Sequence, residues 1–319
     1  MAHGWSRRRR TLTLLVVAAA MSGALVAMLP RQAAHSVALA PRPHSTMSRL
    51  IPLPALGLPQ PLPLTYGGGQ VEVTPKTYMV FWGWANPADP VATLMRSFVG
   101  AIGGTSWAAI DNQYYETDNG QQLHVTNPAN QLAGVWFDNT NPINNNLSTN
   151  DIANEALRGI QHFGITDLHD SNVVVAQPQN ANDAGFNSGQ YCAWHDISSN
   201  GYALPVGTPP FAFTSMPYVL NQGAACGQDF VNTAPGGDLD GFTIVLGHEI
   251  EEAVTDPGGG IPSDTGWMDF NTSENGDKCS WVSIGPGGVT NITGNDGRLY
   301  AAQGLWDNSQ LFGLGYCSN

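Results

Sequence analysis

Basic residues are scarce over most of this 319-residue chain. Seven of its 12 Lys and Arg residues are arginines within the first 50 positions, which contain no Asp or Glu; the rest has five basic against 25 acidic residues. A surface this negative repels nucleic-acid phosphates and anionic lipid head groups. We therefore expect no nucleic-acid partner.

Other patterns are absent as well. There is no CxxC pair, which argues against a zinc knuckle or a dithiol redox motif, and no internal repeat is visible, which argues against a solenoid. Only 12% of the residues are charged, whereas 42% are apolar and nine are Trp, so disorder is a poor interpretation. The composition indicates an acidic globular protein.

The N-terminus has the pattern of an export signal. A basic stretch ends at Arg10, and the apolar run over 11–29 has the length of a signal-peptide core or a short anchor. The following sequence is Pro-rich and polar. We predict a signal peptide over 1–40, a secreted extracellular protein and no stable membrane insertion after cleavage, with a retained anchor as the alternative.

The four cysteines agree with export. They all lie after residue 190, and an even number in an exported chain suggests two disulfides. Spacing leaves three connectivities open. We choose the most local one, which joins Cys192 to Cys226 and Cys279 to Cys317.

Composition divides the remaining chain into two parts. Residues 41–75 are rich in Pro and Gly and predict a linker, an extended strap or a short pro-segment. Residues 76–319 alternate strand and helix patterns, which predicts a single α/β domain with a mixed sheet, flanking helices and long loops. Strands are expected over 76–84, 135–137, 172–176 and 210–219, and helices over 89–99, 106–115, 148–163 and 240–255.

The last of these helices contains the motif His248-Glu249-x-x-Glu252. Side chains four residues apart lie on one helix face, so His248 and Glu252 can bind one metal ion while Glu249 points into the adjacent cleft. This is the geometry of an HExxH zincin helix with Glu in place of the second His. In such sites the metal lowers the pKa of a water molecule, and the Glu that follows the first His accepts its proton.

Helical periodicity tests whether these charges simply face solvent. At about 100° per residue, Glu249 falls inside the apolar stripe and His248 and Glu252 lie at its edge, whereas Glu251 and Thr255 take the solvent side. Charges that face a core must be paired or coordinate a ligand. The pattern favours a metal site over a solvated helix face, with a buried structural network as a further alternative.

A third ligand must come from outside the motif. Glu274 follows Glu252 by 22 residues, a spacing similar to that of the distal Glu in HExxH…E peptidases, and is our first choice. His195, Asp256 and Asp269 are the alternatives, although Asp before Pro commonly ends a helix and Asp269 can cap a turn. One His and two carboxylates neutralise Zn²⁺ and also suit Ca²⁺ or Mn²⁺, so zinc is expected with these two metals as alternatives.

Several short segments, taken in order, resemble the secreted EXORDIUM / phosphate-induced protein family. They include YMVFW at 78–82, GQYCAWH at 189–195, TDP at 255–257 and ENGDKC at 274–279. The resemblance covers the domain after residue 75 and implies a secreted, cell-wall-associated protein with no established enzymatic activity. Because plant members usually lack the His-Glu pair, this chain looks like a bacterial-type relative that bears HExxE.

The sequence therefore predicts a secreted metal-dependent hydrolase, best described as a zinc endopeptidase acting on a peptide or protein substrate. The expected ligands are His248, Glu252 and Glu274, with Glu249 as general base. The alternatives are a non-catalytic extracellular protein associated with cell-wall material, and a glycoside hydrolase that uses two of the carboxylates. Ten of the 25 acidic residues lie within 238–277, which has no Lys or Arg, and this favours cationic or neutral substrates over anionic ones.

Overall fold

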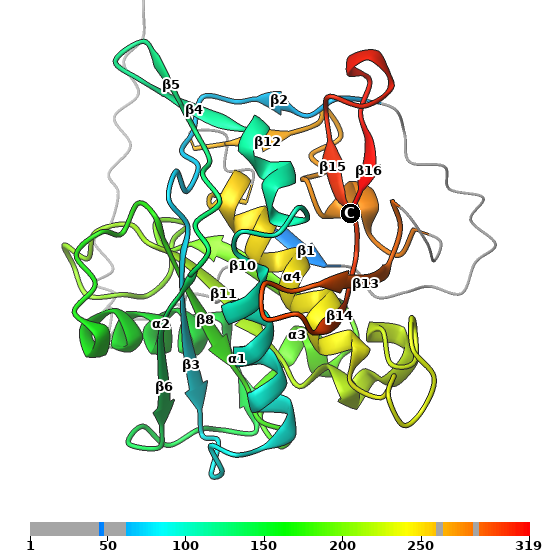
Figure 1. The fold of residues 1–319 in the computed structure, drawn as a ribbon. Helices are drawn as coiled ribbons and strands as arrows, with labels where there is room; N and C mark the ends of the chain where they lie inside the picture. The colour runs from blue at the N-terminus through cyan, green and yellow to red at the C-terminus, as the bar shows by residue number, and fades with distance from the viewer. Residues whose placement is uncertain (1–44, 48–61, 260–263, 283–286) are drawn as a thin grey trace, which may run out of the picture. The chain divides into compact units, whose positions relative to one another are not determined.

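The computed structural model describes residues 45–47, 62–259, 264–282 and 287–319 (Figure 1). The predicted signal peptide lies outside these residues. Within the described part of the chain, no helix is both long enough and apolar enough to cross a membrane.

A six-stranded mixed sheet forms the framework and confirms the predicted α/β class. Its strand order is β1-β10-β11-β8-β3-β6, in which the last four strands run parallel to one another. Strand β10 pairs antiparallel with β11, and β1 pairs antiparallel with β10 at the edge of the sheet. The strands are β1 Ser45–Met47, β3 Lys76–Trp82, β6 Leu132–Asp138, β8 Ser171–Ala176, β10 Ala193–Ile197 and β11 Ala212–Met216.

Helices cover both faces of this sheet. Gly159 of α2 packs against Val80 and Val173, whereas α4 packs on β10 and β11 beside α1 (Figure 1). His195 of β10 pairs with Thr214 of β11. Thr214 in turn pairs with the residue that follows Val173 in β8. Successive strand residues face opposite sides, so His195 lies on the face covered by α4. The helices are α1 Pro90–Ile102, α2 Thr149–Phe163 and α4 Asp240–Thr255.

Helix α4 is enclosed on all sides, since every residue from 240 to 255 is buried. The hairpin formed by β13 (Thr290–Thr293) and β14 (Leu299–Ala302) covers its outer side, and the Thr243 hydroxyl donates to the Ala301 carbonyl at 2.6 Å. The prediction that positions 251 and 255 face solvent is therefore wrong. Glu251 instead interacts with Asp111, and the Thr255 main chain lies against Gly266. Periodicity within one helix does not reveal such neighbours from distant parts of the chain.

Two disulfides, Cys192–Cys226 and Cys279–Cys317, confirm the predicted pairing. The first joins the residue before β10 to a 3₁₀ helix over Val219–Cys226, and the second joins a 3₁₀ helix over Asp277–Cys279 to β16 (Tyr316–Ser318). Each bridge therefore anchors a segment next to α4.

Two other segments differ from the predictions. The helix expected over 106–115 is a 3₁₀ helix over Ala108–Gln113, because the chain turns into the β4–β5 hairpin at Tyr115. Within the predicted linker, β2 pairs with β12, and Leu64 and Val71 join a small apolar cluster. The remaining elements are β2 Thr65–Tyr66, β4 Tyr115–Asp118, β5 Gln121–His124, β7 Asn146–Leu147, β9 Asn182–Asp183, α3 Ala184–Asn187, β12 Trp267–Met268, β15 Leu305–Asp307, β16 Tyr316–Ser318 and a 3₁₀ helix over Leu311–Gly313.

Candidate metal centre

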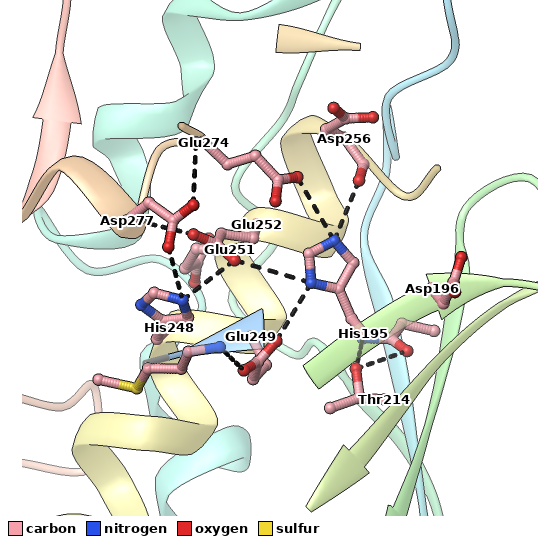
Figure 2. A network of polar contacts seen from close by, with 12 residues as sticks. His195, Asp196, Thr214, His248, Glu249, Glu251, Glu252, Asp256, Glu274 and Asp277 are labelled. Atoms are coloured by element: carbon pink, nitrogen blue, oxygen red, sulfur yellow. Dashed lines mark hydrogen bonds and ion pairs between the residues drawn. The ribbon is translucent and has the colours of Figure 1, made fainter. Parts of the chain in front are cut away.

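Two histidines and several carboxylates converge between α4, β10 and the loop after β12 (Figure 2). They form two groups, His248 with Glu249 and Glu252, and His195 with Glu252 and Glu274. Within each group, one ligand atom from every residue lies within 4.8 Å of the others. Glu252 belongs to both groups and links the motif to Glu274, but His248 and Glu274 do not share a group.

His248 and Glu252 form the core of this cluster. His248 Nε2 lies 3.1 Å from Glu252 Oε2 and 3.9 Å from Asp277 Oδ1. Nε2 is buried, and both of these neighbours are carboxylates. Two ligands held about 2.0–2.2 Å from one ion lie roughly 3.3 Å from each other, so this spacing fits a shared cation.

Gln303 determines which nitrogen of His248 faces the carboxylates. Its side-chain Nε2 donates to the Gly276 carbonyl at 2.9 Å, which leaves its Oε1 3.3 Å from His248 Nδ1. That oxygen accepts and does not donate, so His248 Nδ1 carries a proton. The Nε2 atom of His248 is then the one presented to a cation.

His195 links the two groups from β10. Its Nδ1 lies 3.1 Å from Glu249 Oε2 and 3.7 Å from Glu252 Oε2. Its Nε2 lies 3.5 Å from Glu274 Oε1 and donates to the main-chain carbonyl of Asp256 at 3.1 Å. This imidazole therefore fixes Glu249 and reaches both carboxylates of the second group.

The cluster is closed from solvent. His195, His248, Glu249 and Glu252 have no exposed surface, and Glu274 is 2% exposed. The prediction that Glu249 points into an open cleft is therefore wrong for this structure. Strand β1 lies in front of its carboxylate, where the Met47 amide donates to Oε1 at 3.2 Å.

Burial and close charges shift the pKa values of the cluster. Burial acts to lower the pKa of His248, but Glu252 outweighs it and the pKa rises to about 10. Burial is likewise outweighed at His195, mainly by Glu274 and Glu249, and its pKa lies well above the usual value. Burial raises the pKa of Glu249, and His195 offsets this only in part. Bound protons thus offset the negative charge of these carboxylates, and a bound divalent cation would offset it instead.

The other two predicted ligands have different partners. The Asp256 carboxylate accepts from a backbone amide in the following loop at 2.9 Å, so only its main-chain carbonyl contacts His195. Asp269 caps a turn through backbone amides and pairs with Lys278 at 2.9 Å. His195 and Glu274 are therefore the predicted residues that join the motif.

Three contacts to this cluster were not predicted. They are the Gln303 side chain on His248, the Asp277 amide that donates to Glu252 Oε1 at 2.7 Å, and the amide of Met47 on Glu249. Two of the contacts use main-chain groups, which leave no sequence signal. Gln303 lies 55 residues from His248 with no motif around it.

Comparisons with family models, curated proteins and solved structures find no match to this chain. The resemblance to the EXORDIUM family therefore stays a prediction. The function of the cluster is argued from its geometry and charge.

Proposed function

We propose that this protein is an exported metal-dependent hydrolase, with a zinc endopeptidase as the best candidate. The observation that supports this most is the buried His248–Glu252 pair, with Nε2 and Oε2 3.1 Å apart and the imidazole oriented by Gln303. Glu274 offers a further ligand oxygen beside Glu252, whereas the two nitrogens of His195 face Glu249 and the Asp256 carbonyl and orient the cluster. Imidazole and carboxylate donors suit Zn²⁺, with Ca²⁺ and Mn²⁺ as alternatives.

In this proposal, Glu249 is the general base. A zinc ion bound by the neighbouring residues would act as a Lewis acid and lower the pKa of water. Glu249 accepts the proton of the attacking water and passes it to the leaving amine. His195 Nδ1, 3.1 Å from Glu249 Oε2, holds this carboxylate in place.

The Glu249→Gln variant tests this role. We expect its kcat on unstructured casein to fall by about 10²–10⁴-fold while its metal content stays unchanged, because Gln keeps the shape but accepts no proton. Glu251→Gln is the matched control, since Glu251 is equally buried on the same helix but interacts with Asp111. Equal activity of wild type and Glu249→Gln would contradict the assignment.

The alternative is a non-catalytic, cell-wall-associated protein of the EXORDIUM type, in which the same charges form a structural network. The complete burial of the cluster favours it. It predicts that a chelator leaves the melting temperature unchanged, while His248→Ala still lowers the free energy of unfolding. The hydrolase proposal predicts that the chelator lowers the melting temperature of wild type and has no such effect on His248→Ala.

Export is the other part of the proposal. Two disulfides suit an oxidising compartment. We expect mass spectrometry of the protein secreted by a bacterial host to show a mature N-terminus near residue 40. A product that keeps residues 1–29 and sediments with membranes would instead support the retained anchor.

A further inference from the structure

The edge of the six-stranded sheet beside the cluster is occupied by a short piece of the chain's own N-terminal region. Strand β1 pairs antiparallel with β10, with Ser45 opposite His195 and Met47 opposite Ala193. The pairing continues past β10, where the Cys192 amide donates to the Met47 carbonyl at 2.8 Å. An extended peptide therefore lies along the strand that carries one of the site histidines.

This peptide also contacts the proposed general base. The Met47 amide donates to Glu249 Oε1 at 3.2 Å, and Met47 and Glu249 have no exposed surface. The Met47 side chain belongs to the main apolar cluster of the protein. A backbone amide on Glu249 and an apolar side chain in an enclosed position are what a bound peptide would supply there.

Strand β10 has supports that do not depend on β1. Its other edge pairs with β11 over four residues, and Cys192, which precedes it, is bridged to Cys226. Its Asp196 accepts from the Tyr202 hydroxyl at 2.6 Å and from Asn200 at 2.8 Å. An edge strand that is held in this way can exchange one partner strand for another.

We propose that the β10 edge beside Glu249 is a binding site for extended peptides with an apolar side chain, and that β1 is its internal occupant. This proposal rests on the proposed function. It adds to that function the way in which a peptide substrate binds. While β1 is in place, the same hydrogen bond that would position a substrate amide is used by Met47. The N-terminal segment then acts as an inhibitor of its own chain.

The test uses the full chain with a recognition sequence for a site-specific protease placed within residues 48–61. Before and after cleavage, a fluorescent peptide with the sequence of residues 42–49, RPHSTMSR, is titrated and its anisotropy measured. We expect binding to the cut protein and none to the intact protein. Equal binding to both, no binding to either, or unfolding of the cut protein would overturn the proposal.

Two altered peptides examine the contact with Glu249. Methylation of the nitrogen corresponding to Met47 removes the donor, and a hydrogen bond to a charged group is worth about 1.5–3 kcal/mol, so affinity should fall about 10- to 100-fold. Norleucine in place of Met47 keeps the amide and the shape, and should bind like the parent peptide. Equal affinity of the methylated and parent peptides would contradict the proposed register.

Measuring casein hydrolysis distinguishes a failure of this inference from a failure of the proposed function. If both hold, cleavage of the chain raises the rate of casein hydrolysis at least about tenfold, because the β10 edge is freed. If the peptide binds the cut protein but no metal and no hydrolysis are found, only the hydrolase proposal fails. If the intact and cut proteins hydrolyse casein at the same rate, only the role of β1 fails.

Discussion

His248 depends on a single side chain for its orientation. Gln303 accepts from its Nδ1 and is itself fixed by donating to the Gly276 carbonyl. We predict that Gln303→Ala lowers zinc affinity about 10- to 100-fold, as expected for loss of a group that orients a ligand. Titration against a competing chelator measures this, with Gln310→Ala, at an exposed position, as control. Unchanged affinity in Gln303→Ala would show that the imidazole needs no such support.

A residue outside the cluster, Glu155, makes the stability of the folded protein depend on pH. Glu155 of α2 is buried, and burial raises its pKa from 4.5 to about 7 despite a hydrogen bond from Asn141 and the nearby Arg158. Between these pH values, the folded protein holds a proton that the unfolded chain has lost. Glu155 therefore favours folding most below pH 4.5, and this contribution falls as pH rises towards 7.

Glu155→Gln should remove this contribution. We expect the stability of the variant relative to wild type to rise by about 2 kcal/mol between pH 5 and pH 8, measured by urea unfolding. Asp167→Asn, at an exposed ion pair with Lys76, serves as control and should show the same difference from wild type at both pH values. Parallel behaviour of Glu155→Gln and wild type would argue against a proton on Glu155.

At the scale of secondary-structure elements, the loop before Cys279 approaches α4 so closely that only glycine fits. A Cβ on Gly276 would lie 2.8 Å from His248 Nδ1 and 2.9 Å from Glu252 Oε1. We predict that Gly276→Ala lowers zinc affinity about 10- to 100-fold, since it displaces the two proposed ligands of the motif. Calorimetric titration with zinc measures this effect.

Gly100 of α1 provides the matched control. A Cβ there would make only an ordinary contact at 3.7 Å with Leu132. Gly100→Ala should leave zinc affinity unchanged and raise the free energy of unfolding by up to about 1 kcal/mol, because Ala favours the helix. Equal zinc affinity of Gly276→Ala and wild type would mean that the loop adjusts without disturbing the ligands.

Periodicity and capping residues within a segment predict helices α2 and α4 correctly. Helix α4 has the predicted bounds, and α2 begins after Ser148 in a capping box with Asp151. Spacing likewise predicts the motif pair and Glu274; Glu274 lies beside Glu252 and His195, but His248 and Glu274 share neither of the two groups. The strand β10 was not predicted, because its sequence AWHDI has no alternation and every residue is buried. The sequence alone therefore leaves His195 among the alternatives.

The sequence pattern does not indicate the hairpins after residue 287, for a different reason. Their strands are three or four residues long, which is too short for a periodic pattern. This region supplies Gln303 and covers the outer side of α4. The closure of the site thus depends on contacts between segments far apart in the sequence.

Under the proposed function, the uneven charge of the whole molecule predicts a substrate preference. After residue 50 the chain has five basic and 25 acidic residues, and the site helix lies in the stretch 238–277, which has no Lys or Arg. We expect Lys- and Arg-rich peptides to be hydrolysed with about tenfold higher kcat/KM than Asp- and Glu-rich ones, a difference that shrinks as salt is added. A preference for the acidic peptides would contradict this.

Under the proposed function, the cluster around His248, Glu252 and Glu274 holds a divalent cation. The most direct measurement is the metal content of the purified full chain after exposure to zinc and removal of unbound ions, determined by mass spectrometry beside His248→Ala. We expect one zinc or more per wild-type chain and a clear loss in the variant. A wild-type protein that is folded, with both disulfides formed, and contains no stoichiometric metal would contradict it.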